Sequence, residues 1–168
     1  RSSFQAAFFA AMPFLHSCKL LLILAVTSRV PDLDGVLQYM GEVVVGFLDV
    51  RRAHFVSKAR RELYVELPDE LQGANTGMVG RLLRSLYGTR DAAQNWEYAV
   101  AELLVNILGF IQGLCSPCHY WHPEKLIRVS VHGDDFTSLG SKANVNWFFG
   151  ELGKHWMVEV RGILGPPG

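Results

Sequence analysis

The sequence has no surplus of charge of either sign, because 16 lysine and arginine residues balance 16 aspartate and glutamate residues. It therefore lacks the overall basic character that most free-standing nucleic-acid-binding domains show. The basic residues are nevertheless unevenly spread, and about forty residues near the middle of the chain hold Arg51, Arg52, Lys58, Arg60, Arg61, Arg81, Arg84 and Arg90. This cluster predicts either a local nucleic-acid-binding patch or a solvated charged face.

Cysteine is scarce as well, with only Cys18, Cys115 and Cys118 in the chain. An odd number without dense spacing argues against a disulfide framework and favours a reducing intracellular compartment over secretion. Cys115 and Cys118 stand close to His119 and His122, but the spacing C-x2-C-H-x2-H is too short for a standard zinc finger. We expect both histidines to be surface residues beside a strand.

Uninterrupted apolar runs of membrane-spanning length are also missing. The stretch 4–26 is apolar enough to imitate a signal peptide or a membrane span, but it is interrupted by Gln5, Pro13, His16 and Lys19. We therefore expect a buried helix here and no association with a membrane. Because the chain starts at Arg1 rather than at a methionine, we also expect it to be a fragment of a longer protein.

The sequence does have the composition of a folded domain, with 49% hydrophobic and 19% charged residues among 168. Its apolar patterns predict helices at 18–28, 91–110 and 141–156, and strands at 42–50, 60–67, 126–131 and 136–139. Loops are expected at 31–41 and 69–80. Asp91 and Ser141 suit the N-termini of the last two helices. This order predicts an α+β fold in which helices pack on one face of an antiparallel sheet.

Three aspartates occupy positions that suit a metal site. Asp49 comes near the end of the buried strand 42–50, and Asp134 and Asp135 are expected at the tip of the hairpin. A carboxylate at the end of a buried strand requires a cation, a donor network or a metal. Carboxylate oxygens are ligands that Mg²⁺ prefers, and two such ions can catalyse phosphoryl transfer. An Asp-Asp pair alone is more often a surface turn, so the flanking sequence has to decide.

Four segments around these aspartates resemble the copia-type retrotransposon reverse transcriptases, in the order of that family. They are FLDVRRAHFVSKARRELYVELP (47–68), RLLRSLYGTRDAAQNW (81–96), GFIQGLCSPCHYW (109–121) and VSVHGDDF (129–136). The likeness extends over about 19–165. It implies an RNA-directed DNA polymerase with a polymerase palm at 41–165 and a helical part of the fingers at 1–40, in the cytoplasm, in virus-like particles, or in the nucleus.

The resemblance also implies the roles of individual residues. Asp49, Asp134 and Asp135 become catalytic and bind two Mg²⁺ ions, which Mn²⁺ could replace, and the carbonyl of Val50 joins them on the metal. The expected partners are an RNA or DNA template with its primer and deoxynucleoside triphosphates. The predicted nucleotide or template contacts are Arg51, Arg52, His54, Tyr87, Gly88 and Asp91. For Arg51 and Arg52, simple surface solvation is an equally good interpretation.

The sequence departs from the family at several of these positions. His54 stands where the family has an aromatic residue that excludes the ribose 2′-hydroxyl, and Asp91 replaces a glutamine. His132 and Gly133 replace Tyr-Val, which gives the GDD form of viral RNA-templated RNA polymerases. For the family's lysine after the hairpin, the sequence offers Lys154 and Arg161 nearby, but Glu159 stands close to the expected position and the role has no assigned residue. Two alternatives therefore remain: an inactive remnant of an element, or an RNA-templated RNA polymerase palm.

Overall fold

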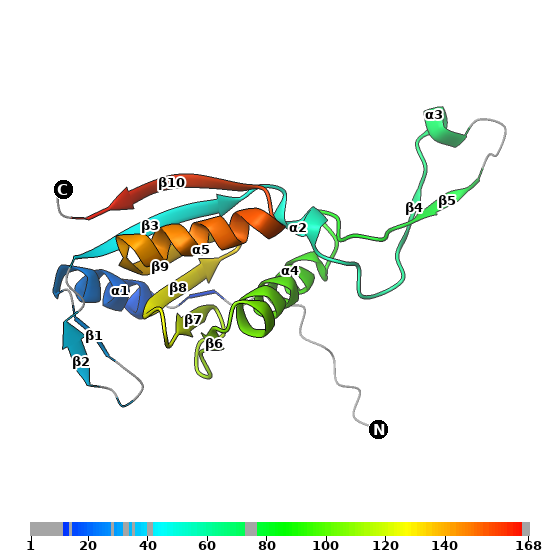
Figure 1. The fold of residues 1–168 in the computed structure, drawn as a ribbon. Coiled ribbons are helices and arrows are strands. Elements are labelled where there is room, and N and C mark those ends of the chain that lie inside the picture. The colour runs from blue at the N-terminus through cyan, green and yellow to red at the C-terminus, as the bar shows by residue number, and fades with distance from the viewer. Residues whose placement is uncertain are drawn as a thin grey trace, which may run out of the picture. The chain divides into compact units, whose positions relative to one another are not determined.

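A computed structural model describes residues 12–13, 15–27, 29–31, 34, 36–39, 42–72 and 77–165 (Figure 1). Within this part of the chain there are two compact units. The smaller unit holds Arg52–Ala99, and the larger unit holds the remaining described residues. The predicted division between residues 1–40 and 41–165 stays a prediction.

The larger unit is built on a six-stranded sheet in the order β10-β3-β9-β8-β7-β6, with every neighbouring pair antiparallel. Its strands are β3 (Val43–Val50), β6 (Ile111–Gln112), β7 (His119–His122), β8 (Ile127–His132), β9 (Asp135–Ser141) and β10 (Val158–Leu164). The predicted α+β class, the strand at 42–50 and the hairpin are confirmed. We did not predict β6, β7 or β10. β6 and β7 are only two and four residues long and leave little local pattern, and β10, an edge strand, carries charged residues that interrupt its alternation.

Helix α5 (Lys142–His155) packs on one face of this sheet and runs along β3 and β9 in Figure 1. Its predicted N-cap is confirmed, since the Ser141 hydroxyl accepts a hydrogen bond from the backbone N–H of Asn144 at 3.3 Å. The contact is close at Gly46, where a Cβ would lie 2.6 Å from both Phe149 and Val145. A glycine in β3, an inner strand of the sheet, thus allows the helix to approach the backbone.

Helix α1 (Leu15–Thr27) packs on the opposite face of the sheet. Leu21 and Leu24 form a buried cluster with Val43, Val45 and Leu139, which alternate with the residues under α5. The prediction that helices lie on one face only is therefore wrong. The physical reason lies in β3, whose residues on both faces are apolar, so both faces need a cover.

The expected buried helix is found as α1, but it is buried along one stripe only. Only the stripe around Leu21 and Leu24 is buried, and Leu20, Leu22, Ile23 and Val26 are more than half exposed. In the described residues no helix is long and apolar enough to cross a membrane. The segment predicted as a loop at 31–41 contributes to a two-stranded hairpin instead, made of β1 (Arg29–Pro31) and β2 (Leu37–Tyr39).

The smaller unit contains α2 (Ala53–Val56), β4 (Tyr64–Glu66), α3 (Asp69–Gln72), β5 (Val79–Arg81) and most of α4 (Ala92–Ala101). β4 is shorter than the strand predicted at 60–67 and pairs with β5, which begins inside the predicted loop 69–80. The predicted helix at 91–110 is confirmed as α4 followed by a π-helical segment, η1 (Glu102–Ile107), in the larger unit. Gly109 follows with a φ of +77°, a left-handed conformation that glycine commonly adopts just after a helix end.

Candidate active site

Three carboxylate residues form a row across the strands β10, β3 and β9. Asp49 is paired directly with Asp135 on one side and with Glu159 on the other. Residues that face each other in neighbouring antiparallel strands project from the same face, with Cβ atoms typically about 4.5–5.5 Å apart. In β3, Asp49 follows Val43, Val45 and Phe47 at every second position, so its side chain is on the same face of the sheet as theirs. The row therefore lies on the face that carries α1.

Asp134 lies in the turn between β8 and β9, beside this row. Its backbone carbonyl accepts a hydrogen bond from the backbone N–H of Val50 at 2.9 Å, which fixes the turn against the end of β3. Gly133 precedes it with a φ of +63°, the left-handed conformation that glycine adopts without strain. The predicted hairpin tip is thus held next to the strand end that carries Asp49.

The donor set suits Mg²⁺, which takes one or two protein carboxylates and completes its shell with water and substrate phosphate. Asp49 and Asp135 provide two carboxylates from adjacent strands. Among the described residues, no three His, Cys, Asp or Glu side chains are grouped so that they could hold a metal ion. The fit therefore rests on Asp49 and Asp135, and the predicted set of three aspartate ligands stays a prediction.

Two arginines offset the negative charge of the row. Arg51 donates two hydrogen bonds to Oε2 of Glu159, at 3.0 and 2.8 Å. Arg161 donates to Oε1 of Glu159 at 2.7 Å and lies 3.4 Å from Oδ2 of Asp49. The hydrogen bonds from Arg51 and the charge of Arg161 hold the pKa of Glu159 below its ordinary value. Since like charges directly opposite each other destabilise a sheet, these cations stabilise the row.

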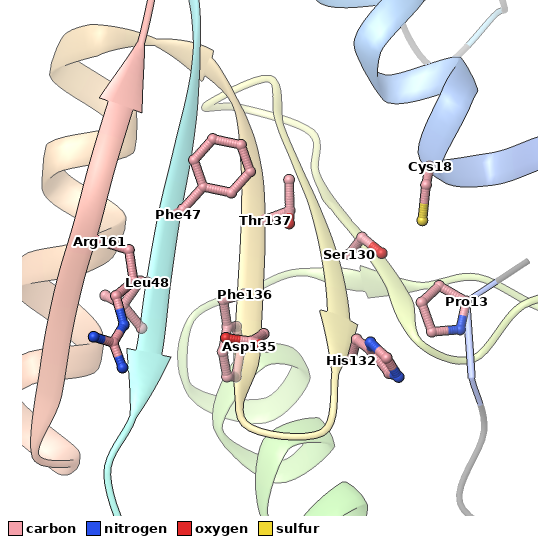
Figure 2. A pocket seen from close by; sticks show the side chains of 10 residues that line it. All are labelled: Pro13, Cys18, Phe47, Leu48, Ser130, His132, Asp135, Phe136, Thr137 and Arg161. Carbon is pink, nitrogen blue, oxygen red and sulfur yellow. The ribbon is translucent and has the colours of Figure 1, made fainter. Parts of the chain in front are cut away.

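A cavity of about 420 Å³ borders the row (Figure 2). Asp135 and Arg161 both line it, together with Ser130 and His132 of β8, Thr137 of β9 and apolar neighbours such as Phe47. Figure 2 shows Asp135 and His132 near the turn that joins β8 and β9. One carboxylate of the row, that of Asp135, therefore borders a cavity with both polar and apolar walls. The sequence placed Glu159 and Arg161 near the position of the family's lysine but did not indicate that they contact Asp49, because β10 was not predicted; the cavity was not predicted either.

The other predicted contacts, apart from Arg51, lie in the smaller unit. The ring of Tyr87 stands edge-on to His54, at 4.4 Å between centroids, and to Phe55, at 5.2 Å. Gly88 follows with a φ of +88° and open space where a Cβ would be. Arg52 precedes α2 in the left-handed conformation. The structure thus brings His54, Tyr87 and Gly88 into one neighbourhood, as a set of candidate nucleotide contacts.

Asp91 is a buried carboxylate in the smaller unit that pairs with the partly exposed Arg61. Its side chain is only 6% exposed, and both of its oxygens lie 3.1 Å from nitrogens of Arg61. Asn95 donates to the same carboxylate at 3.2 Å and to Ser85 at 3.0 Å. Burial raises the pKa of Asp91, but hydrogen bonds from Arg61, the backbone and Asn95 outweigh it and lower the pKa. These contacts support a structural role; the predicted nucleotide contact stays a prediction.

Asp91→Asn should therefore destabilise the protein by about 1–2 kcal/mol near pH 7, because the charged hydrogen bonds to Arg61 are lost. The folded-state pKa lies below the ordinary 3.8, so the stabilisation is present above that pH and disappears as pH falls through the folded-state pKa. Urea denaturation of both proteins at about pH 7 and pH 2.5 measures this.

Glu62→Gln is the matched control for this prediction, since it removes a carboxylate from an ion pair with Arg81 in which both side chains are more than half exposed. We expect a change of less than about 0.5 kcal/mol there. A difference between wild type and Asp91→Asn that is the same at both pH values would contradict the assigned role of Asp91.

His122 corrects the expectation of two surface histidines. It belongs to β7, is buried, and packs edge-on to Phe110 and Trp147. Its Nδ1 accepts a hydrogen bond from the backbone N–H of Lys125 at 3.3 Å, and burial lowers its pKa. His119, also in β7, is half-buried and has Ser116 and Cys118 beside its Nδ1, at 3.0 and 3.2 Å.

Comparisons with protein-family models, with curated proteins and with solved structures found no match to this chain. The class of the fold therefore stands on the structure itself, as an α+β protein with an antiparallel six-stranded sheet and a row of carboxylates across three of its strands.

Proposed function

We propose that this chain carries the palm of a metal-dependent nucleotidyltransferase, an RNA-directed DNA polymerase of the copia type. The pairing of Asp49 with Asp135 is the observation that carries this proposal. Asp49 and Asp135 belong to two separate segments, 47–68 and 129–136, that each resemble that family. Their pairing brings the carboxylates of both segments to adjacent positions on one face of the sheet. The backbone hydrogen bond from Val50 to Asp134 holds the turn between β8 and β9 beside these two residues.

In this proposal, Asp49, Asp135 and the carbonyl of Val50 hold Mg²⁺, with Asp134 beside them. The bound ions would lower the pKa of the attacking primer 3′-hydroxyl and stabilise the charge that develops on the phosphates. The protein contributes mainly positioning. The antiparallel pairing of β3 with β9 fixes the spacing of the two carboxylates, and the cavity beside Asp135 provides room for a polar ligand.

Primer extension tests the reaction class. Purified protein that contains this chain should extend a DNA primer on an RNA template with deoxynucleotides, in the presence of Mg²⁺ or Mn²⁺. Extension with ribonucleotides in preference to deoxynucleotides would replace the proposal by an RNA-templated RNA polymerase. Absence of any extension with either nucleotide and either metal would favour the inactive remnant.

A further inference from the structure

Arg161 stands at an irregularity of strand β10. Val160 pairs with Leu48, and Gly162 pairs with the next residue of β3, Phe47, so Arg161 is an extra residue without a counterpart in the register. Such a β-bulge re-aims the side chain that it carries and is common beside active sites. Here the guanidinium contacts Glu159 at 2.7 Å and Asp49 at 3.4 Å, and Arg161 also lines the cavity that holds Asp135.

The two contacts of Arg161 differ in kind. The contact with Glu159 is short, and Arg51 holds the other oxygen of that carboxylate, so Glu159 is fixed between two cations. The contact with Asp49 is longer and lies at the limit of hydrogen-bonding distance. Glu159 is therefore the anchor of Arg161, while Asp49 can exchange this guanidinium for another cation. The Asp49 side chain is only 16% exposed, which makes an uncompensated charge there costly.

We propose that Arg161 is a positioning residue that neutralises and orients Asp49 when no metal is bound, and that a divalent cation must displace it from this carboxylate. This inference rests on the proposed function, because it assumes that Asp49 is a metal ligand. Anchored by Glu159, the displaced guanidinium stays beside the site and can return when the metal leaves. Glu159, which the sequence left without a role, thereby acquires one.

Binding of Mn²⁺ to the metal-free full chain tests this, with free Mn²⁺ measured by electron paramagnetic resonance. Arg161→Gln removes the competing cation and should tighten the apparent Kd by about two- to fivefold, the range expected for release of an exposed ion pair. Arg161→Ala should shift the Kd in the same direction. Arg161→Lys keeps the positive charge and should bind Mn²⁺ nearly as wild type does.

Arg51→Gln is the matched control, because the Arg51 and Arg161 side chains are 57% and 55% exposed and both contact Glu159, whereas the ion pair with Asp49 is made by Arg161. It should tighten Mn²⁺ binding less than Arg161→Gln does. An unchanged or weaker affinity in Arg161→Gln and Arg161→Ala would overturn the role of Arg161. Equal tightening of Mn²⁺ binding in Arg51→Gln would overturn this role too, because the gain in affinity would then come from the loss of any nearby positive charge and not from release of Asp49.

The same titration separates this inference from the proposed function. If Asp49→Asn and Asp135→Asn lose Mn²⁺ binding while the Arg161 variants bind as wild type does, the metal site stands and only the role of Arg161 is refuted. If wild type binds no Mn²⁺, or binds it equally well after both aspartate changes, the metal site itself is refuted, and the inference with it.

Discussion

Asp135→Asn should reduce the rate of primer extension by about a thousandfold or more, while the protein stays folded. The change keeps the size of the side chain but removes a charge that the proposed metal site requires. Metal ions contribute several kcal/mol of transition-state stabilisation in such reactions, and about 4 kcal/mol corresponds to a thousandfold in rate. Asp135 is exposed at the first position of β9, so little packing is lost.

The measurement compares initial rates of deoxynucleotide incorporation in wild type and in Asp135→Asn, at saturating Mg²⁺ and again at saturating Mn²⁺. Asp49→Asn should show a loss of similar size, because the two residues are paired across β3 and β9. Asp69→Asn serves as the matched control, since Asp69 is an exposed aspartate at the start of α3 and outside the row. It should keep the wild-type rate.

Thermal denaturation followed by circular dichroism shows whether the aspartate variants are folded. We expect the surface change at Asp135 to alter the free energy of unfolding by no more than about 0.5 kcal/mol. A folded Asp135→Asn protein that extends primers at the wild-type rate would be incompatible with the proposed active site.

The second large effect concerns the interior of the sheet, where Gly46→Ala should lower the free energy of unfolding by about 1–3 kcal/mol. An added Cβ would lie 2.6 Å from Phe149 and Val145 of α5 and 2.9 Å from the hydroxyl of Ser138. That hydroxyl donates a hydrogen bond to the carbonyl of Gly46 at 3.2 Å. Either α5 must move away from β3, or its side chains must leave their preferred rotamers.

Gly150→Ala is the matched control, because Gly150 lies on the exposed side of α5 with open space where a Cβ would be. Alanine is the better helix former, so this variant should be more stable by about 0.5–1 kcal/mol. Urea denaturation of both variants gives the two free energies. Equal stabilities for Gly46→Ala and wild type would show that α5 does not approach β3 as closely as described.

Local sequence patterns were enough for several elements. The run of β-branched residues before Asp49 predicts β3, and alternation on both sides of His132 and Gly133 predicts the hairpin of β8 and β9. Ser141 and the apolar spacing after it predict α5 and its cap. These features depend on residues close together in the chain, where periodicity and turn preference act directly.

Patterns failed where a segment's structure depends on a distant partner. β10 follows α5 and is half exposed, with charged residues at Glu159 and Arg161 that hide its alternation. Helix α1 is apolar all round, so its composition could not tell which stripe packs on Val43 and Val45. Asp91 precedes α4 as its place in the sequence suggests, but no local pattern indicated that its carboxylate also pairs with Arg61, thirty positions earlier in the chain.

The sequence by itself determined that Asp49 would end a buried strand and that Asp134 and Asp135 would lie at the tip of a hairpin. Only the tertiary structure decided that Asp49 faces Asp135 and Glu159, and that Arg51 and Arg161 offset their charge. The physical reason is that period-two alternation specifies which face a residue takes, but not which residue of a distant strand it meets. Arg51 and Glu159, 108 positions apart in sequence, meet because β10 pairs with β3 at the edge of the sheet.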